Sequence, residues 1–193
     1  MIRILIVDDQ KSVREQLQIL LGQEADLEVV GTAEDGYAAF EQVIELRPDI
    51  VLIDMIMPGI DGLSTAQIIC QNFSDTKLIA WSNFDSEDLV NKFLQVGAKG
   101  YLLKDTPIEE LVEAIALVNQ GSIQISPRLT GNRAKNITDV VEFPPVSRIA
   151  KFTNRVKAKT KQVNVVNSWV EGVKNTFSLF KFKLRLSIRI TAC

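Results

Sequence analysis

The chain has 193 residues, of which 46% are hydrophobic, so it is long enough for one well-packed domain with an appendage and too apolar for a disordered protein. Its net charge of −2 hides a division, because residues 1–129 carry 9 Lys and Arg against 21 Asp and Glu, whereas residues 130–193 carry 13 against 3. Such a division suggests two parts with different partners, or parts that attract each other. The chain has no histidine, which excludes histidine-based catalysis and histidine metal sites.

The sequence predicts a cytoplasmic protein. No apolar run approaches the ~20 residues that span a bilayer, and the apolar strand that begins at residue 2 leaves no room for a signal peptide. The two cysteines form neither a disulfide framework nor a metal-binding pattern, which is consistent with a reducing compartment.

The first 121 residues predict five strand–helix repeats. The five apolar strands are expected at residues 2–7, 27–30, 50–53, 77–81 and 100–103. An amphipathic helix follows each strand, and the helices end near Gly22, Pro48, Gly97 and Gly121 or at the next strand. Repeats of this length predict an α/β fold in which a doubly wound, five-stranded parallel sheet is covered by helices on both faces.

Acidic residues follow two of the predicted strands directly. Asp8 and Asp9 end the first strand, and Asp54 ends the third. Ligands of an open parallel sheet bind beyond the carboxyl ends of its strands, so neighbouring first and third strands would bring these three carboxylates together. Such a cluster repels itself unless a hard cation binds it, and its oxygen ligands suit Mg²⁺. The sequence therefore predicts a Mg²⁺ site beside a reactive carboxylate.

The residues at the strand ends, taken together, resemble a known family. Asp8 and Asp9, Asp54 with the loop 57–62, Ser82 and Lys104 are similar to the receiver domain of two-component response regulators. The resemblance covers residues 1–127 and implies the CheY-like, flavodoxin-like (βα)5 fold with strand order 2-1-3-4-5. The string 100–105 is most similar to the nitrate/nitrite-regulator subfamily of NarL/LuxR type.

The resemblance also implies the chemistry of the site. Asp54 would accept a phosphoryl group from the phosphohistidine of a sensor histidine kinase. Asp9 would bind Mg²⁺ directly and Asp8 through water, while Asp54 and the Ile56 carbonyl would complete the protein ligands. Such a protein is a signalling phosphoacceptor with self-directed phosphotransfer and autodephosphorylation, not an enzyme that acts on other substrates.

Two further positions complete the implied switch. Lys104 would supply a positive charge to the phosphoryl oxygens, and Ser82 would donate its hydroxyl to them. Ser82 and the strand-five aromatic Tyr101 would move together between two arrangements. The side chains of Ile56 and Phe84 would flank the site and limit the access of water. A Mg²⁺-dependent phosphatase is the enzymatic alternative, but residue 56 is an isoleucine where that class would place a second acid.

The predicted domain ends at residue 127 and is followed by a linker, 128–146, and a basic tail, 147–193. Pro144 and Pro145 fall where a DNA-binding helix-turn-helix would need a helix. Within the tail an apolar heptad stripe predicts a helix of about 30 residues, and residues 180–190 then alternate apolar and polar or basic as a strand does.

Three roles remain open for the tail. The heptad stripe would pair with a second copy or a partner helix, or the basic amphipathic helix would lie on an anionic membrane surface, or its charge would bind nucleic acid. The sequence thus predicts a response regulator whose output is protein or membrane interaction. The alternative is a transcriptional regulator whose DNA-binding domain is divergent or lost.

Overall fold

The computed structural model of the protein describes residues 1–129; most of the predicted linker and all of the basic tail lie outside them. Six strands and five α-helices are formed there, followed by a short 3-10 helix. The strands are β1 (Ile2–Val7), β2 (Leu27–Ala33), β3 (Ile50–Ile53), β4 (Lys77–Ser82), β5 (Gly100–Leu103) and β6 (Gln124–Ile125). The helices are α1 (Lys11–Leu21), α2 (Gly36–Leu46), α3 (Gly62–Asn72), α4 (Glu87–Gln95), α5 (Ile108–Asn119) and the 3-10 helix η1 (Pro127–Leu129).

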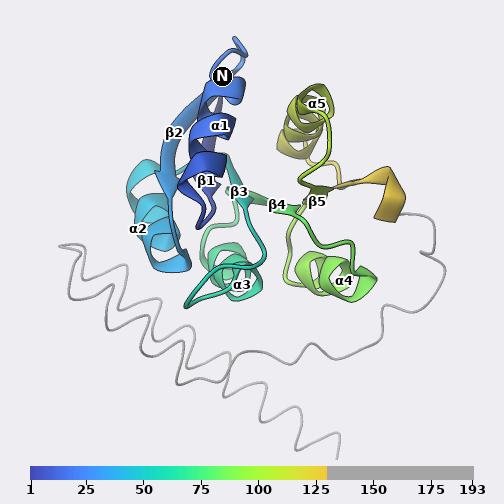
Figure 1. Ribbon diagram of the computed structural model, residues 1–193. Helices are drawn as coiled ribbons and strands as arrows, with labels where there is room; N and C mark the ends of the chain where they lie inside the picture. Colours follow the sequence, from blue (N-terminus) through green and yellow to red (C-terminus); the bar gives the residue numbers. More distant parts are fainter. Residues whose placement is uncertain (130–193) are drawn as a thin grey trace, which may run out of the picture. The chain divides into compact units, whose positions relative to one another are not determined.

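The strands form one parallel sheet in the order β2-β1-β3-β4-β5-β6. Helices α1 and α5 cover one face of this sheet, and α2, α3 and α4 cover the other (Figure 1). The central strands β3 and β5 are buried along their whole length, as expected for a parallel sheet whose crossovers place helices on both faces. The doubly wound fold and the order of the first five strands are therefore confirmed.

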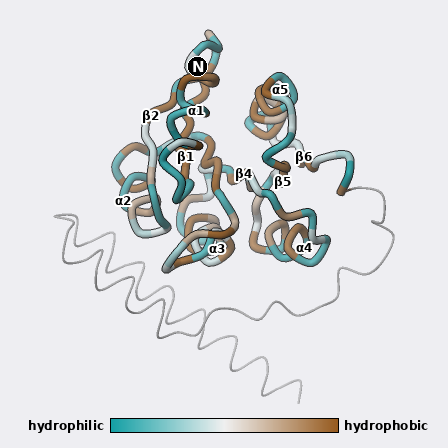
Figure 2. The backbone as a smooth tube through the Cα atoms, viewed as in Figure 1, coloured by the Kyte–Doolittle hydropathy of each residue, from teal (hydrophilic) through white to brown (hydrophobic). Residues whose placement is uncertain are grey.

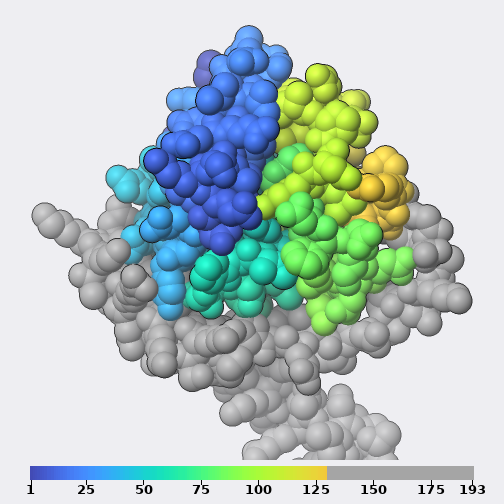
Figure 3. Space-filling model, viewed as in Figure 1, coloured from blue at the N-terminus to red at the C-terminus, as the bar shows by residue number. Residues whose placement is uncertain are grey.

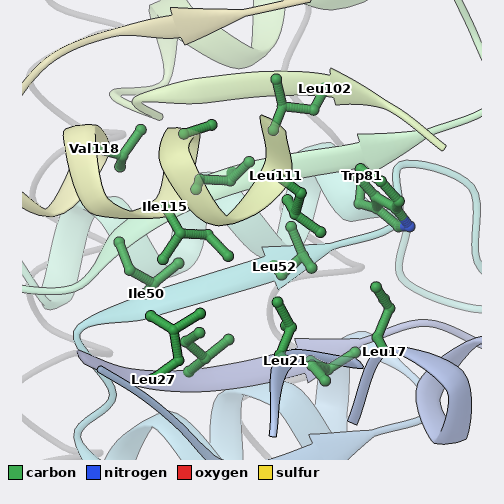
Figure 4. Packing of buried hydrophobic residues seen from close by; sticks show 14 residues of the cluster. Leu17, Leu21, Leu27, Ile50, Leu52, Trp81, Leu102, Leu111, Ile115 and Val118 are labelled. Carbon is green, nitrogen blue, oxygen red and sulfur yellow. The ribbon is translucent and has the colours of Figure 1, made fainter. Parts of the chain in front are cut away.

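Two apolar layers hold the helices on the sheet. Alternate residues of β1 point to opposite faces, so Ile4 and Ile6 join the layer beneath α1 and α5, together with Leu17 of α1 and Ile115 of α5 (Figure 4). The hydropathy colouring places apolar residues along the strands and on the flanking helices (Figure 2). β3 and β5 are buried along their whole length and contain no charged residue. The first charged residues after β1, β3 and β5 are Asp8, Asp54 and Lys104.

The prediction of five strands was one strand too few. Gln124 and Ile125 add a sixth, parallel strand beside Gly100 and Tyr101 of β5. Both residues are half-buried, and two residues are too few to produce the alternation that identifies a strand in a sequence.

The second strand is also longer than predicted. It continues past Val30 through Gly31 and Thr32 to Ala33, although glycine normally weakens a strand. A Cβ on Gly31 would lie 2.4 Å from the Gln42 side chain, so the small residue lets α2 approach the strand closely. Among residues 1–129, no helix has both the length and the hydropathy to cross a membrane.

Candidate phosphoacceptor site

Three polar side chains meet where β1, β3 and β5 end. The Lys104 ammonium group lies 2.7 Å from Asp8 Oδ2 and 2.9 Å from Asp54 Oδ2. The three side chains are only 10%, 2% and 7% exposed, respectively. Because parallel strands end at the same edge of the sheet, residues 46 and 50 positions apart in the sequence become neighbours. The structure thus brings together the predicted acids and the predicted lysine.

Lys104 forms salt bridges with both buried acids, and these contacts shift its pKa. Burial lowers the pKa of Lys104, but the hydrogen bonds and charges of Asp8 and Asp54 outweigh burial and raise it above its ordinary value of 10.5. Two buried carboxylates within 4.8 Å of each other would be unfavourable without a counter-charge. Lys104 supplies that charge and occupies the place between the two acids.

The remaining carboxylate oxygens are held by the turns that follow the strands. The Gln10 amide donates to Asp8 Oδ1 at 2.9 Å, and the Ile56 amide donates to Asp54 Oδ1 at 3.2 Å. Aspartate commonly accepts from the amide two residues later, and this local bond orients the side chain. Each buried acid is therefore fixed on one oxygen by its own turn and on the other by Lys104.

The third acid, Asp9, is exposed beside this pair. Carboxylate oxygens of Asp8, Asp9 and Asp54 all lie within 4.8 Å of one another. Carboxylates are the hard oxygen donors that Mg²⁺ takes, and this ion keeps several waters and needs few protein ligands. Only Asp9 of the three is exposed to solvent. The donor set of the described residues therefore fits a divalent cation, as predicted. The role predicted for the Ile56 carbonyl stays a prediction.

The predicted switch residues lie on the neighbouring strands. The Ser82 side chain is fully buried, and its hydroxyl accepts a hydrogen bond of 3.1 Å from the Phe84 amide. The hydroxyl of the buried Tyr101 donates to the Phe84 carbonyl at 2.9 Å. Burial raises the pKa of Tyr101 and outweighs a side-chain hydrogen bond with Ser82, which lowers it, while the charges of Asp54 and Asp85 add to the rise. Both side chains therefore hold the backbone of the same loop after β4, at Phe84.

The surroundings of the acids are partly apolar. Ile56 and Phe84 are 52% and 46% exposed, on the loops that follow β3 and β4. A pocket of about 250 Å³ lies between α1 and α5 and is bordered by Leu17, Trp81 and Lys104. The surfaces of these two helices meet in the space-filling view (Figure 3). The pocket therefore extends from the helix surface to the lysine of the site.

The sequence did not reveal two residues that contact the site's loops. The Arg14 guanidinium donates to the carbonyls of Asp8 and Asp9, at 2.7 and 3.2 Å. The buried Ser126 hydroxyl accepts from the Leu103 amide, the residue before Lys104. A single arginine on a helix and a single serine after a glycine-containing turn are common on protein surfaces, so neither carries a signal without the tertiary structure.

Comparison with known proteins identifies the family. Residues 4–116 match the family of the response regulator receiver domain. The chain is 40% identical over 146 residues to the oxygen regulatory protein NreC of Staphylococcus epidermidis, a match that covers 75% of this chain and 67% of NreC. It is 33% identical over 175 residues to the transcriptional regulatory protein LnrK of Bacillus subtilis, covering 91% of this chain and 80% of LnrK.

Solved structures agree with this assignment. A LuxR-family two-component response regulator from Aurantimonas superposes with a TM-score of 0.64 at 30% identity, over 67% of this chain and 92% of that one. The signal receiver domain of NarL from Mycobacterium tuberculosis superposes with a TM-score of 0.60 at 35% identity, over 62% and 97%. The acids, the lysine and the hydroxyl at the strand ends thus occur in the fold that these proteins share, and the chain belongs to the family of response regulator receiver domains, with relatives of the NarL/LuxR type.

Proposed function

We propose that the chain accepts a phosphoryl group on Asp54 and changes its surface in response. The observation that carries the proposal is that Lys104 pairs with two buried carboxylates, Asp8 and Asp54, while Asp9 lies beside them. Asp54 is held by Lys104 on one oxygen and by the Ile56 amide on the other. A carboxylate beside a mobile positive charge is suited to phosphoryl transfer, which depends mainly on positioning and on stabilisation of charge.

The proposed reaction is a transfer from the phosphohistidine of a sensor histidine kinase. An oxygen of Asp54 forms a bond to phosphorus while the bond from phosphorus to the histidine nitrogen breaks, and that nitrogen takes up a proton from solvent. The product is an acyl phosphate. Lys104 follows the new phosphoryl oxygens because its ammonium group is a point charge on a flexible stem. The Ser82 hydroxyl turns from the Phe84 amide to donate to the same oxygens.

A Mg²⁺ ion held by Asp8, Asp9, Asp54 and the Ile56 carbonyl would supply charge neutralisation at the phosphoryl oxygens. The protein's own residues do the rest. Asp8 would leave Lys104 in order to hold the cation, and Lys104 would then be free to contact the phosphoryl oxygens. Ile56 and Phe84 restrict the approach of water, so they set the rate at which the acyl phosphate hydrolyses. The chain acts on itself in this proposal and not on a separate substrate, as suits a cytoplasmic regulator.

The output of the switch would pass through the loop after β4. When Ser82 leaves the Phe84 amide, that amide loses its partner, and the hydroxyl of Tyr101 remains the side-chain contact of the loop. The exposed Phe84 side chain then changes position on the surface that a partner meets. Protein or membrane interaction is the proposed output of this change.

A second candidate output is the control of transcription. LnrK is a transcriptional regulatory protein, and its match covers 91% of this chain, which is more than residues 1–129. The similarity therefore reaches past the receiver domain. Titration of the full chain with duplex DNA, with and without beryllofluoride, tests the transcriptional output. If the chain prefers one DNA sequence and keeps that preference as salt is raised, the result supports control of transcription. If it binds every duplex equally and this binding is lost at high salt, the result supports binding by charge alone.

Incubation with acetyl phosphate and Mg²⁺ tests the phosphoacceptor proposal. The intact mass of the wild type should rise by one phosphoryl group, and that of Asp54→Asn should not. Asp26→Asn is the matched control, because Asp26 is an exposed acid away from the site, and it should behave like the wild type. Equal uptake by the Asp54→Asn variant would refute the proposal.

A further inference from the structure

The sixth strand ends in a side-chain hydrogen bond where a backbone bond would be expected. The Ser126 amide donates to the Tyr101 carbonyl at 3.0 Å, as in a regular parallel ladder. The next bond would join the Leu103 amide to the Ser126 carbonyl, but that carbonyl accepts from the Leu129 amide at 2.9 Å. The Ser126 hydroxyl takes its place and accepts from the Leu103 amide at 3.0 Å.

This hydroxyl also reaches the turn on the other side of Lys104. Ser126 Oγ lies 3.3 Å from Thr106 Oγ, within hydrogen-bond distance. Arg128 forms an ion pair with Asp105 in the same turn. Residues 103, 105 and 106 are therefore all in contact with the segment 126–128, and Lys104 lies between them. On the opposite side, the Lys104 amide donates to the Ser82 carbonyl at 2.8 Å.

We infer that Ser126 is a positioning residue for Lys104, an inference that rests on the proposed phosphoacceptor function. Its hydroxyl fixes the end of β5 and the turn that follows, so the lysine stem starts from one defined place. The Ser126 side chain is buried, and the amide that it satisfies is buried as well. Water therefore does not replace the hydroxyl when it is removed, and the turn must shift to find another partner.

The effect should be specific to the lysine and not to the acids. Asp8, Asp9 and Asp54 lie on the loops after β1 and β3, which have no described hydrogen bond to residues 122–129. Cation binding depends on those carboxylates, whereas phosphoryl transfer also needs Lys104 in place. Loss of the Ser126 hydroxyl should thus slow phosphoryl transfer without weakening cation binding. A general loss of stability would impair both.

The test uses full-length Ser126→Ala, with Ser122→Ala as the matched control because Ser122 is an exposed serine of the same segment. Calorimetric titration gives the dissociation constant of Mg²⁺, and intact mass gives the rate of phosphorylation by acetyl phosphate at saturating Mg²⁺. We expect Ser126→Ala to slow phosphorylation about tenfold, since removal of a group that orients a ligand costs roughly that much. Mg²⁺ binding should not weaken, because Lys104 competes with the cation for Asp8 and Asp54 and a displaced lysine competes less. Ser126→Thr, which keeps the hydroxyl, should restore the rate.

The outcomes are distinct. If the wild type takes up no phosphoryl group, both the proposed function and this inference are refuted. Two results would refute this inference alone, with a wild type that is phosphorylated. In the first, Ser126→Ala is phosphorylated as fast as the wild type. In the second, the variant loses Mg²⁺ affinity by the same factor as it loses phosphorylation rate. If Ser126→Ala does not fold, Thr106→Val removes the second contact of the hydroxyl and leaves the Leu103 amide satisfied. A rate for Thr106→Val equal to that of the wild type then overturns the inference.

Discussion

Replacement of Lys104 by methionine should destabilise the protein strongly when no divalent cation is present. The change removes the ammonium group that lies 2.7 and 2.9 Å from two carboxylates, and all three side chains are at most 10% exposed. Removal of one partner from a buried ion pair costs about 3–5 kcal/mol, because the charges that remain are uncompensated. That cost is a large part of the ~5–15 kcal/mol by which a typical domain is stable.

The same variant should gain more stability from Mg²⁺ than the wild type does. In the wild type, a cation competes with Lys104 for Asp8 and Asp54, whereas in Lys104→Met it finds the carboxylates free. A ligand at 100 times its dissociation constant stabilises the folded state by about 2.7 kcal/mol, so tighter binding gives a larger gain at the same concentration.

Urea unfolding in EDTA and in saturating MgCl₂ measures both effects. Lys92→Met is the control, since Lys92 pairs with Asp88 on the surface of α4 and should contribute about 0.3–0.5 kcal/mol. The reasoning is refuted if Lys104→Met is as stable in EDTA as Lys92→Met, or if MgCl₂ raises the free energy of unfolding of both variants equally.

Three other predictions follow from the site and its loops. The pKa of Lys104 is raised in the folded state, so its contribution to stability is fully present below the ordinary value of 10.5 and is lost as the pH rises through the folded value. The difference in unfolding free energy between the wild type and Lys104→Met should therefore stay constant from pH 7 to 9. It should shrink in the more alkaline range. Tyr101→Phe should lower the free energy of unfolding by about 1 kcal/mol and speed hydrogen exchange in the loop around Phe84, because the 2.9 Å bond to its carbonyl is lost; unchanged exchange would contradict this role. Gly62→Ala should cost about 3 kcal/mol in thermal or urea unfolding, since its Cβ would lie 2.1 Å from the Asp54 carbonyl oxygen and backbone must move; a cost below about 1 kcal/mol would contradict the close approach.

The core of the fold was predictable because its strands are buried on both faces. Runs such as 2–7 and 50–53 are nearly uninterrupted apolar segments, and the polar residue after each run marks the edge of the sheet where ligands bind. Convergence of Asp8 and Asp54 then required only that strands one and three be neighbours, which the register of β1 and β3 confirms.

The contacts that depend on distant residues were not predictable in the same way. The two-residue strand β6 has no periodic signal, and the role of Ser126 depends on an amide 23 residues earlier in the chain. Arg14 likewise acts on backbone carbonyls, which every residue possesses, so nothing in the sequence marks its partners. The proposed roles for residues 147–193 lie outside the described residues and stay predictions.

The most direct test of the central claim is to locate the phosphoryl group. The full chain is incubated with acetyl phosphate and Mg²⁺, treated with borohydride, which reduces an acyl phosphate of aspartate to homoserine, and digested for peptide mass spectrometry. Homoserine at residue 54 alone, and none without Mg²⁺, is the predicted result. Homoserine at Asp8 or Asp9, or none in the peptide that contains Asp54, would contradict the account.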